Sequence, residues 1–226
     1  MKENRIILPL DNKSVPESFK IIEETSHLVW GYKLRRQILD EGIGIVRKIK
    51  NNFNTKIMVD FKLYDIPSAM DESIKLHVDA LADITTVHCT AQYKPSSFKS
   101  RIAGVTILTS TYLEDFKEVY KELSMEDNFI IPNMVLRLST FANFFNYGYV
   151  VCSGKDLKAV RSLKIKKIVP GIRPLWYQEE DDQKRTVTPK EAIVNGADLL
   201  VIGRPILSSN NIVDSLKRTN DEINII

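Results

Sequence analysis

The stretch KIMVDFKLYDIPS (residues 56–68) runs from an apolar, β-type segment into three full charges, Asp60, Lys62 and Asp65, within six positions. A buried charge without a partner is very costly, so such a cluster persists only when opposite charges pair and hydrogen-bond with one another. The alternative is a purely structural ion-pair network, or separate solvation of each charge at the strand end. We favour a functional cluster at the carboxyl end of a buried strand.

Seven further β-type runs alternate with helical patterns along the chain, and several are apolar almost throughout. Such runs are typical of parallel strands that are covered on both faces. Two helix starts carry capping boxes, at Ser14 with Glu17 and at Thr188 with Glu191. Eight strands in alternation with helices predict a (β/α)₈ barrel, an α/β fold, as one domain over residues 1–226. The seven runs cover residues 5–10, 27–33, 83–88, 103–109, 149–152, 167–170 and 199–203.

Composition narrows the class of protein further. The 226 residues carry 32 basic and 29 acidic side chains, and this net charge of +3 is too small and too scattered to indicate a nucleic-acid partner. Cys89 and Cys152 lie in apolar stretches without metal-ligand spacing, which favours buried thiols in a reducing compartment. The apolar run near the N-terminus is too short for a signal or membrane segment. We expect a cytoplasmic protein that has no membrane partner.

The barrel fold predicts where the charges meet, because active sites of this fold lie at the carboxyl ends of the strands. Asp11 closes the first run and Lys33 the second, so both are expected at the same level. Strand alternation places Asp60 and Lys62 on one face, toward the barrel mouth, with Asp65 in the turn beyond. The sequence therefore predicts carboxylates and ammonium groups gathered at one end of the barrel.

Two loops point to a phosphate ester as ligand. VPGIRP (169–174) ends the seventh run, and VIGRPI (201–206) ends the eighth and is followed by a short helical start at SSNN (208–211). The loops after strands 7 and 8 form the usual phosphate site of this fold. Gly203 would let the backbone approach closely, and Arg204 offers a planar fork of donors. In the alternative, Gly171 and Gly203 serve only tight turns, and the arginines of these loops only pair with acidic side chains on the surface.

These motifs together carry a family resemblance. DFKLYDIPS resembles the D-x-K-x-x-D-I-P motif of orotidine 5′-phosphate decarboxylases, and VPGIRP, DDQKR and GADLLVIGRPI resemble their phosphate-side motifs in order and spacing. RIILPLD, TTVH, VTILTST and GYVVCS are also similar, so nearly the whole chain is covered. The resemblance implies a carbon–carbon lyase that is a homodimeric barrel and converts orotidine 5′-monophosphate to UMP and CO₂, the last step of UMP biosynthesis. It also implies that neither metal nor organic cofactor takes part.

The resemblance also implies roles for single residues. Lys62 would protonate C6 of the substrate, within an alternating charged array completed by Lys33, Asp60 and Asp65. Asp65 would reach into the site of the other subunit. The remaining matches are substrate contacts: Asp11 at the ribose or its neighbourhood, Ile66 against the base, Thr109 with Ser110 at the pyrimidine, and Arg173, Gln183, Gly203 and Arg204 at the phosphate.

The sequence departs from the family pattern in places. Arg35 stands where a small residue is common, and Ala69 where a hydroxyl is usual. A competing register places Val29 at the second-strand lysine position, although Lys33 aligns better with the helix that follows. Two alternative functions therefore stay open. One is a catalytically impaired relative that binds nucleotide phosphates, and the other is a metal-dependent sugar-phosphate decarboxylase of the same superfamily.

Overall fold

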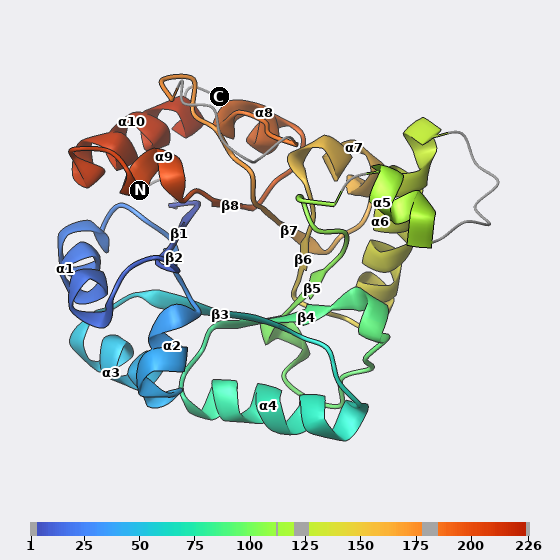
Figure 1. The fold of residues 1–226 in the computed structure, drawn as a ribbon, viewed down its shortest axis with the longest axis horizontal. Helices are drawn as coiled ribbons and strands as arrows, with labels where there is room; N and C mark the ends of the chain where they lie inside the picture. Colours follow the sequence, from blue (N-terminus) through green and yellow to red (C-terminus); the bar gives the residue numbers. More distant parts are fainter. Residues whose placement is uncertain (1–3, 112, 120–126, 178–184, 225–226) are drawn as a thin grey trace.

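Eight parallel strands close into a barrel, each paired with its neighbours in chain order and β8 paired with β1 (Figure 1). This computed structural model describes residues 4–111, 113–119, 127–177 and 185–224. The arrangement confirms the predicted (β/α)₈ fold, and every predicted run overlaps one strand. The strands are β1 Ile6–Pro9, β2 Gly31–Leu34, β3 Lys56–Leu63, β4 Ile84–His88, β5 Ile102–Val105, β6 Tyr149–Val151, β7 Lys166–Val169 and β8 Leu199–Val201.

Helices surround this ring of strands (Figure 1). The α-helices are α1 Val15–Thr25, α2 Arg36–Glu41, α3 Gly44–Asn52, α4 Pro67–Asp79, α5 Leu113–Val119, α6 Asp127–Phe144, α7 Leu157–Val160, α8 Pro189–Val194, α9 Arg204–Leu207 and α10 Ile212–Asn224. Three 3₁₀ turns, η1 Cys89–Ala91, η2 Lys99–Arg101 and η3 Gly154–Asp156, complete the described elements. No helix in these residues is both long and apolar enough to cross a membrane.

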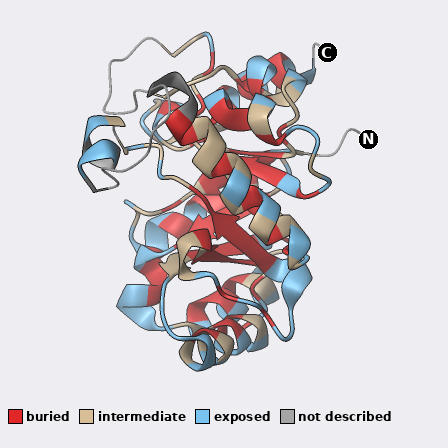
Figure 2. Cartoon of the chain, turned by 90° about the vertical axis from the view of Figure 1, so that its right-hand side faces the viewer, coloured by how far each residue is buried: buried red, intermediate tan, exposed pale blue. Residues whose placement is uncertain are grey.

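The strands bury both of their faces, as the apolar runs predict (Figure 2). In β1, Ile6 and Leu8 pack outward into the large cluster shared with the helices, whereas Ile7 points into the barrel. The barrel interior is filled by six buried side chains from six strands: Ile7, Met58, Ile84, Ala103, Ile168 and Leu199. This inner cluster is a packed floor beneath the strand ends, as is usual for the fold.

Local signals in the sequence fix several helix ends. Ser14 and Glu17 form the predicted capping box at α1, and Thr188 and Glu191 form the one at α8. Gly196 follows α8 with a φ of 100°, a left-handed conformation that glycine adopts without strain. The helical start predicted at SSNN is that of α10. A shorter helix, α9, precedes it and begins at Arg204, directly after Gly203.

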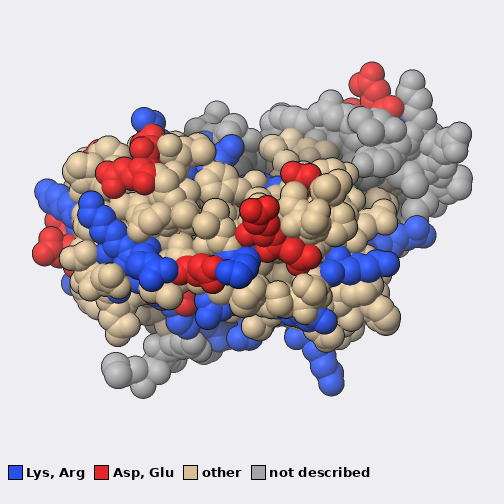
Figure 3. Space-filling model, turned by 90° about the horizontal axis from the view of Figure 1, so that it is seen from below, with Lys and Arg blue, Asp and Glu red and all other residues tan. Residues whose placement is uncertain are grey.

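Charges are spread over the outside of the barrel. On the face drawn in Figure 3, basic and acidic side chains lie interspersed, with no continuous patch of either sign. Both cysteines are free and buried, and burial raises the pKa of each thiol to about 12. The thiols are therefore protonated core side chains at neutral pH.

Candidate active site

Four charged side chains of alternating sign meet at the carboxyl ends of the first three strands. Lys33 of β2 bonds through Nζ to Asp11, just after β1, and lies 3.0 Å from Oδ2 of Asp60. The Nζ atom of Lys62 lies 2.9 Å from the same Asp60 oxygen. The structure thus brings Asp11, Lys33, Asp60 and Lys62 together in one continuous chain of ion pairs.

This geometry assigns the second-strand lysine position to Lys33. Val29 lies before β2, is 4% exposed and belongs to the large hydrophobic cluster between sheet and helices. Lys33 is itself buried, and its backbone pairs with Pro9 of β1 and Met58 of β3. The ammonium group between the two carboxylates is therefore that of Lys33, whereas Val29 belongs to the hydrophobic core.

The backbone of β3 is irregular where Lys62 stands. The pairing register between β3 and β4 shifts between Val59 and Leu63, and Lys62 has a φ of 50°. The Lys62 amide donates to Oγ1 of Thr86 over 2.8 Å, and the Thr86 hydroxyl donates to Oδ1 of Asp60 over 2.9 Å. Asp60 and Lys62 therefore share the barrel mouth as predicted, but through a bulge supported by Thr86 rather than through regular strand alternation.

Burial and neighbouring charge act against each other in this array. Burial by itself would raise the pKa of Asp60, but the ammonium groups of Lys33 and Lys62 hold that pKa at about 2. Burial would likewise lower the pKa of Lys33, but Asp60 and Asp11 outweigh it and the pKa is raised. Asp60 and Lys33 are consequently both charged at neutral pH, although Asp60 is only 5% exposed.

Two adjoining cavities open beside the array. One, of about 350 Å³, is mostly apolar, has Met58 of the packed floor among its lining residues and includes Asp60, Lys62, Thr86, Thr109 and Ser110. The other, of about 320 Å³, is lined by Asp11, Arg173, Gly203 and Arg204, among others. Lys33, Pro170 and Val201 line both cavities, so the two form one continuous bipartite site.

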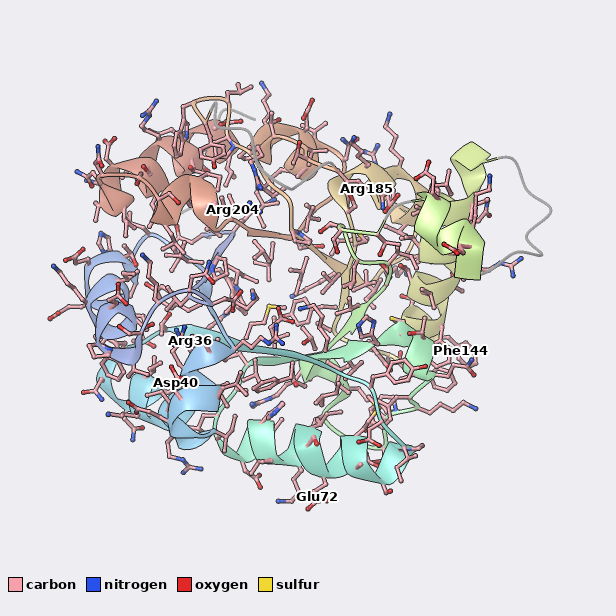
Figure 4. The ribbon with its side chains drawn as sticks, in the orientation of Figure 1. Arg36, Asp40, Glu72, Phe144, Arg185 and Arg204 are labelled. Carbon is pink, nitrogen blue, oxygen red and sulfur yellow. The ribbon has the colours of Figure 1, made fainter. Side chains whose placement is uncertain are left out.

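The polar end of this site is built from the loops after β7 and β8. Gly171 has a φ of 76°, which a side chain would strain. A Cβ atom on Gly203 would lie 2.9 Å from Cγ of Pro9, so glycine allows the backbone after β8 to approach β1. Arg204 follows at once in α9, and Figure 4 shows it on the same side of the barrel as Arg185.

Two predicted residues lie elsewhere. Asp65 is exposed, with the Ile66 amide donating to its Oδ1 over 2.7 Å, and Ile66 is 65% exposed. Neither lines the two cavities of this single chain. Gln183 lies outside the described residues. Thr109 and Ser110 do line the apolar cavity, although β5 ends at Val105 and they belong to the loop that follows.

Sequence reasoning missed some residues of the site. Thr86, which joins Asp60 to the Lys62 backbone, stood inside a strand run without being singled out. Asn12, Lys13 and Ser208 also line the polar cavity. The available signal was position, because each of these residues lies near the carboxyl end of a strand or in the loop that follows one. In the described part of the chain, no three His, Cys, Asp or Glu side chains group as a metal site.

Comparisons with known proteins agree with this architecture. The model of the orotidine 5′-phosphate decarboxylase / HUMPS family matches residues 4–219. An orotidine 5′-phosphate decarboxylase of Prochlorococcus marinus (strain MIT 9215) is 32% identical over 223 residues, which cover 90% of this chain and 89% of the relative. One of Caulobacter sp. (strain K31) is 31% identical over 217 residues, covering 92% and 91%.

Solved structures share the fold. The orotidine 5′-phosphate decarboxylase from Lactobacillus acidophilus superposes with a TM-score of 0.77 at 22% identity, over 99% of this chain and all of that one. The enzyme from Pyrococcus horikoshii OT3 gives a TM-score of 0.74 at 24% identity, over 97% and 99%. The family model extends over nearly the whole barrel, including the charged array and the polar loops, and the sequence relatives each cover about 90% of the chain. The chain belongs to the orotidine 5′-phosphate decarboxylase / HUMPS family.

Proposed function

We propose that this protein decarboxylates orotidine 5′-monophosphate to UMP and CO₂. The observation that carries the proposal is the bipartite site, in which a buried array of alternating charges borders both an apolar cavity and a polar cavity with two arginines. An apolar wall with a few convergent polar groups suits a pyrimidine, and an arginine fork beside glycine backbone suits a phosphate. One nucleotide would occupy both cavities at once.

In this proposal the phosphate lies at Arg173, Gly203 and Arg204, and Gln183 completes its contacts. Asp11 then faces the ribose, since it lines the polar cavity and bonds to Lys33, which borders both cavities. The base extends over Met58 toward Thr109 and Ser110. This pose brings C6 of the base to the Lys62 end of the array.

The chemistry needs a fixed positive charge and a proton at one carbon. Loss of CO₂ from C6 breaks a carbon–carbon bond and leaves an electron pair on that carbon with little resonance stabilisation. The Lys62 ammonium stabilises the developing negative charge and then transfers a proton to C6, which gives UMP and a neutral amine. Asp60 holds Lys62 in place, and its charge beside the leaving carboxylate adds ground-state repulsion. No step in this sequence uses a metal or an organic cofactor.

Phosphate binding contributes to this reaction from a distance. Interactions with a non-reacting group can stabilise the closed, oriented state of the complex, so that binding energy lowers the barrier at the reacting carbon. Arg204 is therefore expected to influence turnover without contacting the base.

We further propose that the working unit is a homodimer. Asp65 and Ile66 are exposed in the single chain, and Tyr64 beside them is 66% exposed, which leaves apolar surface on the turn after β3. Pairing of two copies through this turn would cover these side chains, place Ile66 against the base and bring Asp65 to the neighbouring array.

The test is the loss of orotidine 5′-monophosphate absorbance with purified protein in EDTA, alongside Lys62→Ala. Turnover in chelator that the substitution abolishes supports the proposal. Turnover lost in EDTA and restored by a divalent metal would contradict the metal-free mechanism proposed here. UMP binding without turnover would indicate a catalytically impaired relative.

A further inference from the structure

Asp156 and Arg185 form a nearly buried ion pair that lines neither cavity. Asp156, in η3 after β6, is 1% exposed, and Nη2 of Arg185 lies 2.5 Å from its Oδ1. Burial raises the pKa of Asp156, whereas Arg185 opposes that shift. Buried ion pairs often contribute little net stability compared with apolar side chains of similar size. The pair therefore calls for an explanation other than stability.

Two further contacts fasten the same short segment, residues 185–187, to the loop after β6. The Ser153 hydroxyl donates to the Arg185 carbonyl over 3.4 Å. A Cβ atom on Gly154 would come within 2.2 Å of Cγ2 of Val187, so Val187 packs directly on the glycine. Side-chain charge, a backbone carbonyl and close packing thus fix this segment at three points.

The fastened segment in turn supports the polar cavity. Val187 forms an isolated parallel β-bridge with Ile172. In this bridge the Arg173 amide donates to the Val187 carbonyl over 2.9 Å, and the Val187 amide donates to the Gly171 carbonyl over 3.4 Å. Gly171 and Arg173 both line the polar cavity. A continuous path of contacts therefore leads from Asp156 through Arg185 and Val187 to the wall of that cavity (Figure 4 labels Arg185).

We propose that Asp156 is a positioning residue for phosphate recognition, which it serves by holding Arg185 and, through residues 185–187, the backbone of residues 171–173. The proposal rests on the proposed function for the identity of the substrate. It assigns no contact with the base or with C6, so its effect belongs to the phosphate end alone. A loss of that kind is distinguishable from general damage to the barrel.

The experiment compares Asp156→Asn with the wild type on orotidine 5′-monophosphate and on orotidine, which lacks the phosphate. We expect kcat/KM for the nucleotide to fall at least about tenfold, mainly through a higher KM, while kcat/KM for the nucleoside changes less than about twofold. For Arg185→Lys, which keeps a cation, kcat/KM for the nucleotide should lie between the values of the wild type and Asp156→Asn. Asp83→Asn is the matched control, because Asp83 pairs with Lys50 at 2.8 Å at the opposite end of the barrel. This substitution should not alter the ratio of kcat/KM for the nucleotide to kcat/KM for the nucleoside.

Equal losses on both substrates, or no loss on either, would overturn the proposal. If Asp156→Asn does not fold, Arg185→Lys gives the same comparison. If the wild type fails to turn over the nucleotide, the proposed function fails, but binding of UMP against uridine by calorimetry still decides the role of Asp156. A weaker preference for UMP in the variant supports the role, and an unchanged preference overturns it.

Discussion

The Lys62 ammonium nitrogen lies 2.9 Å from Oδ2 of Asp60, a carboxylate almost closed off from water. A charge held in this way cannot move away without losing its ion pair with this carboxylate. The pair therefore fixes the proposed proton donor in place before substrate arrives, so that little reorganisation is needed during the reaction.

Lys62→Arg tests the positive charge of Lys62 separately from its ability to transfer a proton. Arginine keeps the positive charge beside Asp60 but does not give up its proton near neutral pH, so we expect UMP binding to persist while kcat falls at least about 100-fold. Steady-state kinetics and calorimetry measure the two effects. The control is Lys48→Ala on the outer helix α3, which should leave both unchanged. Wild-type turnover by Lys62→Arg would show that Lys62 does not deliver the proton.

The ionisation of Asp60 makes the free energy of unfolding depend on pH in the acidic range. Its pKa is lowered to about 2 in the folded protein, so its contribution is complete above the ordinary aspartate pKa and is lost as pH falls from about 4 to about 2. We expect this loss to amount to about 2 kcal/mol in the free energy of unfolding, and Asp60→Asn to remove it. Urea denaturation at a series of pH values measures this acid slope, the change in the free energy of unfolding with pH.

The control for this pH effect is Asp40→Asn. Asp40 pairs with Arg36 at 3.3 Å on the exposed surface of α2, where both residues are labelled in Figure 4. Exposed pairs contribute little, so the acid slope of this variant should match the wild type. An unchanged slope in Asp60→Asn would mean that other carboxylates account for the acid sensitivity.

Gly203→Ala tests the close approach at the polar cavity. The new Cβ atom would lie 2.9 Å from Cγ of Pro9, so either the backbone after β8 or the Pro9 ring must shift. We expect KM for orotidine 5′-monophosphate to rise about tenfold or more, because small displacements at a binding site are costly. Gly44→Ala is the matched control, since no atom lies within 4 Å of its Cβ position. If both variants keep the wild-type KM, the backbone at Gly203 does not contribute to phosphate binding.

Mixing two inactive variants tests whether Asp65 completes the neighbouring site. In a heterodimer of Lys62→Ala and Asp65→Asn subunits, one site would hold Lys62 and the partner's intact aspartate. After subunit exchange, about a quarter of all sites should be active, because random pairing makes half of the dimers mixed. Activity assayed before and after exchange measures this recovery. No recovery despite exchange, verified by tagged subunits, would contradict a shared site.

Much of the fold could be predicted because its signals are local. Apolar runs located all eight strands, and the hydroxyl and glutamate pairs at Ser14 and Thr188 located two helix starts. Strand lengths were less accurate. The run at residues 103–109 predicted a strand through Thr109, but pairing with β4 and β6 ends at Val105. Apolar character continues past that point because Ile107 and Leu108 line a cavity.

The site was predicted where charge stands out against an apolar strand, as at Lys33 and Asp60. Thr86 was missed because a threonine inside a β-type run is ordinary, and its role depends on an irregular backbone in another strand. Asp156 and Arg185 were missed for a related reason. They lie 29 positions apart and meet only after two separate loops fold against each other.

The left-handed backbone at Lys62 limits how this array can be transferred to other proteins by design. A non-glycine residue in this conformation costs about 1–2 kcal/mol, and it is tolerated here where Thr86 receives the Lys62 amide. Grafting Asp60 and Lys62 onto a regular strand would keep their identities but misplace the lysine. A designer would have to copy residues 59–63 and their threonine support as a unit, into a host stable enough to accept the strain.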